Sequence, residues 1–210
     1  MKNRVLLIIS WTFFAFVSAH AQIGISVASG VNISNCKFST VDGLSPNPRM
    51  DYFLSLAPSY QLDDKLRFLV DLQYSRKGYV RDYIFSSIDT ELRFSYFDVI
   101  PEIEFKVYPF LSIGFGLNYA VVVNEDQKTE PGNWISTKKL ETIKQSDFGI
   151  NGKIKGEYNN VFCFIRCNYG LKNITNIEYT DDVGRTINVS QYNLNLQIGL
   201  GYTFNFKQNK

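Results

Sequence analysis

Hydrophobic and polar residues alternate without a break through residues 191–206, QYNLNLQIGLGYTFNF. The even positions carry Tyr, Leu, Ile and Phe, whereas the odd positions carry Gln, Asn, Gly and Thr. Strands of soluble sheets are usually about 5 or 6 residues long, so this stretch is long for one. A long strand with one apolar and one polar face, and with aromatic residues at both ends, is typical of a strand that crosses a membrane. The pattern predicts a transmembrane β-strand.

Similar alternation recurs along the chain and predicts seven further strands, over residues 22–33, 51–61, 66–77, 94–106, 111–121, 147–157 and 161–170. The connections between them are alternately long and short, and the long ones are residues 34–50, 78–92, 123–146 and 172–190. Bacterial barrels have short periplasmic turns and longer external loops. We therefore expect an all-β fold: an eight-stranded antiparallel up-and-down transmembrane β-barrel with four long external loops and three short periplasmic turns. Pro101 lacks a backbone donor, and we expect a kink or bulge there.

A secreted, soluble barrel of the lipocalin type is the main alternative, because it also has eight up-and-down strands. Such a barrel is apolar inside and polar outside. Alternation alone does not say which face is inside. The strand length, the aromatic ends and the asymmetry of the loops favour the membrane barrel, with its polar face in the lumen.

The first 21 residues have the features of a cleaved secretory signal peptide: Lys2 and Arg4, then an apolar run, then Ala19-His20-Ala21. We expect residues 22–210 to form the barrel domain. Removal of the signal takes away two bases and no acid from a chain with 22 Lys and Arg and 20 Asp and Glu, so the mature chain is formally neutral. Nothing in this balance favours nucleic acid as a partner.

Ten charged residues fall on the inward faces of the predicted strands, five acids and five bases: Arg67, Asp71, Asp98, Glu102, Glu104, Lys106, Lys153, Lys155, Glu157 and Arg166. An eight-stranded barrel is just wide enough to be filled by its side chains. Charges that cannot reach bulk water must be paired. The balance of signs predicts a closed, ion-paired lumen with Arg166 as a central member, because its planar guanidinium can hold two carboxylates.

The residues give little support to catalysis. The one histidine, His20, lies inside the predicted signal, so the mature chain lacks the usual base for a nucleophile or water and the usual metal ligand. Glu102 and Glu104 could form a catalytic carboxylate pair, but neutralisation by facing bases is the simpler interpretation. Cys163 and Cys167 would lie about 13 Å apart on one strand, too far to bridge, and Cys36 falls in a predicted loop. We expect no enzyme activity and no cofactor.

Two features concern partners. Gly201, Phe204 and Phe206 resemble the C-terminal signal that outer-membrane barrels present to the barrel-assembly machinery. Trp134, beside Pro131 and Gly132 in the third loop, is either an anchor for a ligand or a residue that packs its own loop. We expect the partners to be outer-membrane lipid, the assembly machinery, and an extracellular ligand or secretion-system proteins.

Several short segments also resemble the PorT-like family of bacterial outer-membrane β-barrel proteins: residues 30–34 (GVNIS), 74–78 (YSRKG), 99–101 (VIP), 147–149 (DFG), 166–174 (RCNYGLKNI) and 199–204 (GLGYTF). The resemblance covers nearly the whole mature chain, although Cys167 stands where an aromatic residue is usual. It implies an outer-membrane barrel and, for the member that names the family, a role in protein secretion. We therefore expect a barrel that acts through its surface loops in binding, adhesion or envelope structure, with secretion as the alternative.

Overall fold

The structure, a computed structural model, describes residues 22–38, 46–81, 90–129, 131–138, 143–175, 178–180 and 186–206. The predicted signal peptide, residues 1–21, lies outside the described residues. Eight long strands form the main sheet: β1 (Gln22–Phe38), β2 (Asn47–Gln61), β3 (Leu66–Arg81), β4 (Thr90–Tyr108), β5 (Leu111–Thr129), β7 (Ser146–Tyr158), β8 (Val161–Gly170) and β11 (Gln191–Phe206). Three short strands accompany them: β6 (Ile135–Ser136), β9 (Glu178–Thr180) and β10 (Thr186–Asn188).

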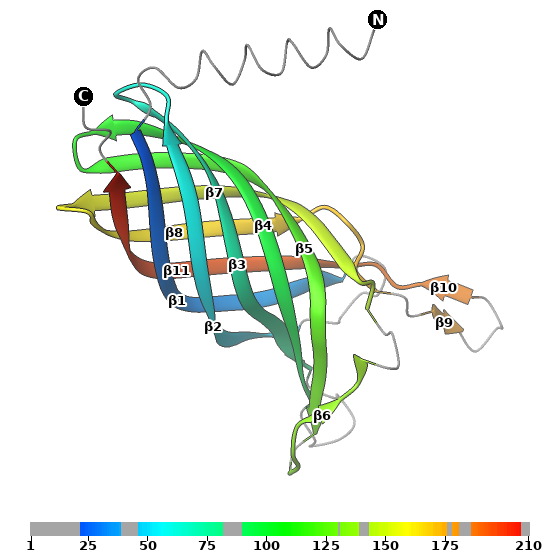
Figure 1. Cartoon of the computed structure of the whole chain (residues 1–210). Coiled ribbons are helices and arrows are strands. Elements are labelled where there is room, and N and C mark those ends of the chain that lie inside the picture. The colour runs from blue at the N-terminus through cyan, green and yellow to red at the C-terminus, as the bar shows by residue number, and fades with distance from the viewer. Residues whose placement is uncertain are drawn as a thin grey trace, which may run out of the picture.

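The long strands form a closed ring in which sequence neighbours are also spatial neighbours. The order is β4-β3-β2-β1-β11-β8-β7-β5, and β5 pairs with β4 to close the ring. The first and last strands pair from Ile23 opposite Phe206 to Phe38 opposite Gln191, all antiparallel. Figure 1 shows the short turns at the end of the barrel where the chain finishes, and β6, β9 and β10 at the other end. The predicted eight-stranded up-and-down barrel is confirmed.

The orientation of the two faces separates the membrane barrel from the soluble alternative. Along β8, Phe162, Phe164, Arg166 and Asn168 are buried, whereas Val161, Ile165 and Tyr169 are exposed. On β11 the side chains of Gln191, Asn193, Asn195 and Gln197 are buried, and those of Leu194, Ile198, Leu200 and Tyr202 are exposed. A polar interior and an apolar exterior are what lipid requires, and they are the reverse of a lipocalin-type barrel. Among the described residues, no helix is long and apolar enough to cross a membrane.

The three short turns form as the sequence predicts. Asn159 and Asn160 have φ values of 48° and 69°. Two consecutive residues with positive φ form the hairpin turn whose twist matches antiparallel strands, and Asn tolerates this conformation well. At the β2–β3 turn, Asp63 Oδ1 accepts hydrogen bonds from the backbone amides of Lys65 (2.7 Å) and Leu66 (2.8 Å).

The external strand ends differ from the prediction. β1 continues to Phe38, β2 begins at Asn47, β4 begins at Thr90 and β5 continues to Thr129, so much of the predicted loops is paired strand. Cys36, placed in a loop by the sequence pattern, lies on β1 and is buried. The extensions persist because their side chains fill the outer end of the lumen: Phe38, Tyr79 and Phe94 pack there against one another.

The expected bulge at Pro101 is absent, although the pairing of β4 with β5 is interrupted at Ile100 and Pro101, between Val99–Tyr119 and Glu102–Gly116. β3 and β4 stay in register through Val70 opposite Pro101. The register shifts of β4 against β5 fall instead between Ser95 and Tyr96 and between Lys106 and Tyr108. A proline removes one ladder donor but does not by itself insert a residue, so the register can continue past it. Gly116 makes this possible, because a Cβ there would lie 2.4 Å from the Pro101 carbonyl oxygen.

Candidate functional site

The barrel lumen holds a continuous ladder of ion pairs near its periplasmic half. It begins where Arg166 on β8 reaches across the barrel. One of its guanidinium nitrogens, Nη2, lies 2.8 Å from Asp71 Oδ2 on β3 and 3.2 Å from Glu102 Oε2 on β4. β8 and β3 lie on opposite sides of the ring, so this one side chain connects the two walls.

The ladder continues toward the periplasm through two lysines of β7. Lys153 pairs with Glu102 and lies 2.6 Å from Glu104 Oε1. Lys155 lies 3.1 Å from Glu104 Oε2 and 3.0 Å from Glu157 Oε2. Lysines two residues apart on a strand share one face, so both ammonium groups reach the same side of the lumen as the β4 glutamates.

Arg67 closes the ladder at the mouth. Its Nη1 lies 3.6 Å from Glu104 Oε2 and 3.4 Å from Glu157 Oε2. Arg67 and Glu157 are about one fifth exposed, whereas the charged side chains farther in are at most 5% exposed. The ladder thus joins eight residues, four of each sign: Arg67, Asp71, Glu102, Glu104, Lys153, Lys155, Glu157 and Arg166.

Aromatic rings stand behind the basic groups of the ladder. The Arg166 guanidinium carbon lies 5.2 Å from the centroid of the Phe164 ring, and Lys155 Nζ lies 5.0 Å from that of Phe162. Phe53 on β2 packs against Phe164 with 5.8 Å between ring centroids. The cations therefore lie between carboxylates and ring faces, which attract them as well. The sequence pattern indicated that this face is inward but not that aromatic residues would line it.

The remaining two predicted lumen charges lie apart from the ladder. Asp98 is fully buried nearer the external end of the barrel, and Lys77 Nζ lies 2.6 Å from its Oδ1. Lys77 was missed because the predicted third strand ended at that residue, although it shares its face with Asp71, Gln73 and Ser75. Lys106 is exposed, so its expected place inside the buried network was wrong. It is close to the end of β4, where side chains reach the open mouth.

Above the ladder, buried amides fill the middle of the lumen. Gln197 on β11 donates a hydrogen bond from Nε2 to Gln73 Oε1 on β3, at 2.8 Å. Asn151, Asn168 and Asn195 form a row of directly opposed residues on β7, β8 and β11, all buried. Buried amides neither repel nor attract ions strongly, but they occupy space in a lumen of this width.

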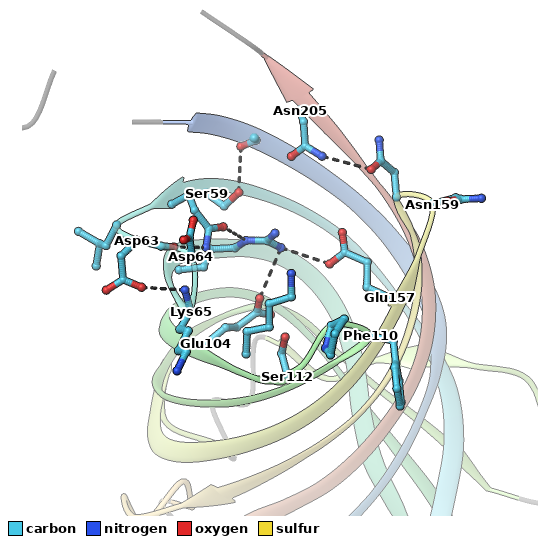
Figure 2. A pocket seen from close by; sticks show the side chains of 17 residues that line it. Ser59, Asp63, Asp64, Lys65, Glu104, Phe110, Ser112, Glu157, Asn159 and Asn205 are labelled. Atoms are coloured by element: carbon cyan, nitrogen blue, oxygen red, sulfur yellow. Dashed lines mark hydrogen bonds and ion pairs between the residues drawn. The ribbon is translucent and has the colours of Figure 1, made fainter. Parts of the chain in front are cut away.

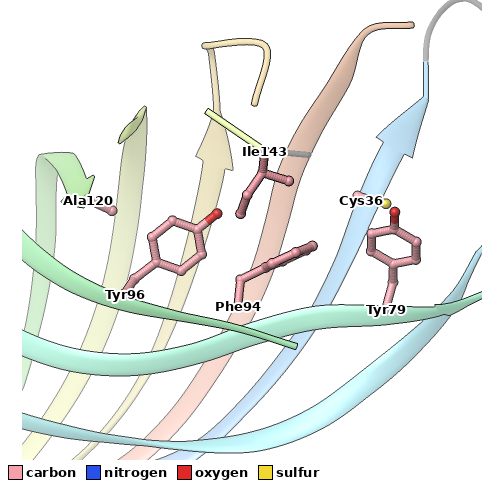
Figure 3. Packing of buried hydrophobic residues seen from close by; sticks show 6 residues of the cluster. All are labelled: Cys36, Tyr79, Phe94, Tyr96, Ala120 and Ile143. Carbon is pink, nitrogen blue, oxygen red and sulfur yellow. The ribbon is translucent and has the colours of Figure 1, made fainter. Parts of the chain in front are cut away.

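An apolar cap closes the external end. It consists of Cys36, Tyr79, Phe94, Tyr96, Ala120 and Ile143, contributed by β1, β3, β4, β5 and the segment before β7. Figure 3 shows these side chains converging from different strands inside the barrel. Lys77 Nζ lies 4.6 Å from the Tyr96 ring centroid, so the cap rests on the Lys77–Asp98 pair. The cap was not predicted, because half of it lies on residues assigned to loops.

The periplasmic end is open to a polar cavity of about 720 Å³. Its walls come from the three short turns and the nearby strand ends and include Asp63, Asp64, Lys65, Lys106 and Asn205. Figure 2 shows Glu104 and Glu157 within this cavity, and Arg67, which also lines it, pairs with both carboxylates. The walls reach inward to Ser59 and Glu104, so the cavity meets the periplasmic end of the ladder.

Trp134 contacts two arginines at the external end. Its ring lies 4.8 Å from the Arg49 guanidinium carbon and 4.0 Å from that of Arg93. Arg49 pairs with Glu91, and Arg93 lies 2.9 Å from Asp126. The segment around β6 is thereby attached to β2 and β4. The side chain is half-buried, and its contacts reach beyond its own loop.

The C-terminal residues Gly201, Phe204 and Phe206 lie at the periplasmic end of β11. Both phenylalanines are exposed on the outer face, and Gly201 faces the Phe162 ring. Cys163 and Cys167 are exposed on the outer face of β8, and all three cysteines are free. Use of this terminus as an assembly signal stays a prediction.

An apolar exterior, a polar interior and alternating turn lengths define a membrane-spanning barrel of the bacterial outer membrane. A family model described as "Outer membrane protein beta-barrel domain" matches residues 18–176, most of the chain. The protein therefore belongs to this family, and its location is the bacterial outer membrane. The finer resemblance to the PorT-like family stays a prediction. A search of curated proteins gave no match.

Several solved outer-membrane proteins are similar in fold. Ail, the attachment invasion locus protein of Yersinia pestis, solved in complex with the heparin analogue sucrose octasulfate, is 14% identical, with 87% of this chain and 99% of Ail covered and a TM-score of 0.49. Neisserial surface protein A is 15% identical, with coverages of 88% and 99% and a TM-score of 0.45. OprG from Pseudomonas aeruginosa is 14% identical, with coverages of 88% and 97% and a TM-score of 0.45. At these identities the similarity concerns the fold.

We predict that Arg166→Met destabilises the folded barrel by about 3–5 kcal/mol, because it leaves Asp71 buried without the guanidinium that neutralises it. Lys106→Met is the matched control: it removes an exposed lysine from the same lumen and should change stability by less than about 0.5 kcal/mol. Urea unfolding in detergent, followed by the heat-dependent shift in gel mobility, measures both. Equal midpoints for the two variants would mean that water screens the ladder.

Proposed function

We propose that this protein is a closed, non-enzymatic outer-membrane barrel that acts through its external surface, in binding, adhesion or envelope structure. The observation that carries the proposal is the filling of the lumen along its length. A charge ladder, a layer of amides and an apolar cap follow one another from the periplasmic mouth to the external end. A barrel built in this way serves as a rigid membrane support for what lies outside.

The sign balance of the ladder supports closure rather than selective conduction. Rings of one charge sign favour passage of the opposite ion in channels. Here every carboxylate of the ladder lies within 4 Å of a basic group, so the ladder itself carries no excess charge of either sign. Passage of an ion would require breaking pairs such as Arg166–Asp71, which are almost completely buried.

The external end supports a role in recognition. β4 and β5 stay paired as far as Thr90 opposite Thr129, far above the last pairing of β5 with β7 at Val121 opposite Ser146. β6 adds to this raised wall, and Trp134 is held against it by Arg49 and Arg93. Next to Trp134, Ile135 is 68% exposed. A fixed wall that presents an exposed aliphatic side chain beside paired charges is suited to contact with another molecule.

A role in protein secretion is the second candidate, and it rests on the PorT-like resemblance alone. Deletion of the gene separates the two proposals. Loss of exported cargo from the medium would favour secretion, whereas normal export with altered attachment or envelope integrity would favour the surface role.

We expect planar bilayers that contain the purified protein to show no large, steady single-channel steps, because the ion-paired ladder, the buried amides and the apolar cap occupy the lumen. A wide open porin in the same bilayers is the positive control. Regular steps with a defined conductance would contradict the closed-lumen proposal.

We expect the surface role to depend on the raised wall. Replacement of residues 131–138 by a Gly-Ser linker should leave the barrel folded, as judged by heat-dependent gel mobility, but reduce attachment of the cells to the level of the deletion strain. Asp64→Ser in a periplasmic turn is the control and should leave attachment unchanged. Attachment equal to wild type in the linker variant would show that this wall is not the recognition surface.

A further inference from the structure

An apolar hollow of about 470 Å³ lies on the outer surface of the barrel, near its periplasmic end. We call it the outer hollow. It is lined by Phe110, Gly156, Glu157, Tyr158, Asn159, Val161, Phe162, Cys163 and Leu200. Phe110 and Leu200 form its two sides and are about 60% exposed. β7 and β8 form its floor.

Two small residues create the hollow. Gly156 on β7 and Cys163 on β8 are directly opposed, and Cys163 is opposed on its other side by Leu200 of β11. One step toward the external end, the outward residues of β7 and β8 are Ile154 and Ile165, both more than half exposed. One step toward the periplasm they are Tyr158 and Val161. The hollow is therefore an open depression in the outer surface, bordered by larger side chains.

The polarity of the outer hollow changes from one end to the other. Its floor and external side are apolar, whereas its periplasmic side includes Tyr158 and the exposed Asn159 of the β7–β8 turn. Figure 2 shows Asn159 at this turn, on the outer side of the barrel wall. Tyr158, Tyr202 and the stacked pair Tyr108–Phe110 lie at the same end, where aromatic residues mark the membrane–water interface. The outer hollow thus extends from the interface into the apolar band.

The outer hollow is apolar with a polar edge at the membrane interface, and this distribution of polarity matches that of an amphiphile. We propose that the outer hollow holds one acyl chain of a phospholipid from the periplasmic leaflet, with its head group beside Asn159. The membrane supplies this ligand at the required depth, because the hollow faces lipid and opens at the level of the head groups. The Asn159 amide can donate a hydrogen bond to a phosphodiester oxygen. The inference depends on the outer-membrane location and not on the proposed surface role.

The chain offers two pairs of matched variants. Gly156→Leu and Cys163→Leu fill the hollow from neighbouring strands. Gly152→Leu and Cys167→Leu place the same side chain on the same two strands, outside the hollow, at positions that are also directly opposed. A Cβ at Gly156 meets only ordinary contacts, the nearest at 3.6 Å, and one at Gly152 meets nothing within 4 Å. All four changes add apolar surface that faces lipid, so the barrel should tolerate them.

Native mass spectrometry of protein extracted from outer membranes in a mild detergent tests the proposal. The wild type, Gly152→Leu and Cys167→Leu should each retain one phospholipid. In both hollow-filling variants the fraction of protein with bound phospholipid should be at least five-fold lower at the same collision energy. Heat-dependent gel mobility checks that all five proteins are folded. If one hollow-filling variant does not fold, the other alone suffices to test the proposal. Equal retention in all variants, or no retained lipid in the wild type, would overturn the proposal. A dimer that the hollow-filling variants dissociate would instead assign the hollow to a second copy of the chain.

Discussion

The charges inside a narrow, filled barrel must neutralise one another, and the rest of this structure depends on that constraint. Neither lipid outside nor bulk water inside can stabilise a carboxylate at the level of Asp71 or Glu102, which are almost completely buried. The ladder meets this need by alternating acids of β3, β4 and β7 with bases of β3, β7 and β8. Because Arg166 spans the ring, the register of strands far apart in the sequence must be correct before its charge is neutralised.

Closure of the barrel and neutralisation of its lumen are therefore linked. β11 must pair with β1 to complete the wall, and β8, which carries Arg166, pairs directly with β11. A slip of one residue in any of these strands would exchange lipid-facing and lumen-facing side chains. In β8 such a slip would place Arg166 in lipid and leave Asp71 without its partner. The ion pairs thus favour one register, while the outer face contributes the apolar surface that keeps the barrel in the membrane.

The same construction explains how the two ends differ. At the periplasmic mouth the ladder is accessible to solvent, because Arg67 and Glu157 are partly exposed in the polar cavity. At the external end the lumen is occupied by the apolar cap. The raised β4–β5 wall continues beyond the cap, and Trp134 is attached to it through two arginines. On the outer face, β7 and β8 carry two directly opposed glycine–cysteine pairs, Gly152–Cys167 and Gly156–Cys163, and the second pair lines the outer hollow.

Alternation in the sequence predicted the eight strands, and strand length, aromatic ends and loop asymmetry then selected the inward face. Together they predicted all eight ladder residues, of which six are deeply buried and two, Arg67 and Glu157, lie at the mouth. The pattern did not predict where paired strands end outside the membrane, because the alternation is lost there, as in residues 122–129 (VVNEDQKT), and the half of the apolar cap that lies on residues assigned to loops was missed for that reason. It also placed Lys106 correctly on the inward face but could not tell that this position lies at the open mouth. Side-chain partners across the lumen depend on the stagger of the whole ring, which no single strand specifies.

The most direct test of the ion-paired lumen is a double-mutant cycle between opposite walls, with Arg166→Met and Asp71→Asn made separately and together. The asparagine retains the shape of the aspartate and its contact with Ser55, which donates to Asp71 Oδ1 at 2.6 Å. Unfolding free energies of the four proteins in detergent give the coupling between the two side chains. A dry pair predicts a coupling of at least about 2 kcal/mol, within the range measured for residues in direct contact. Additive effects, equal to within about 0.5 kcal/mol, would contradict a lumen held together by its charges.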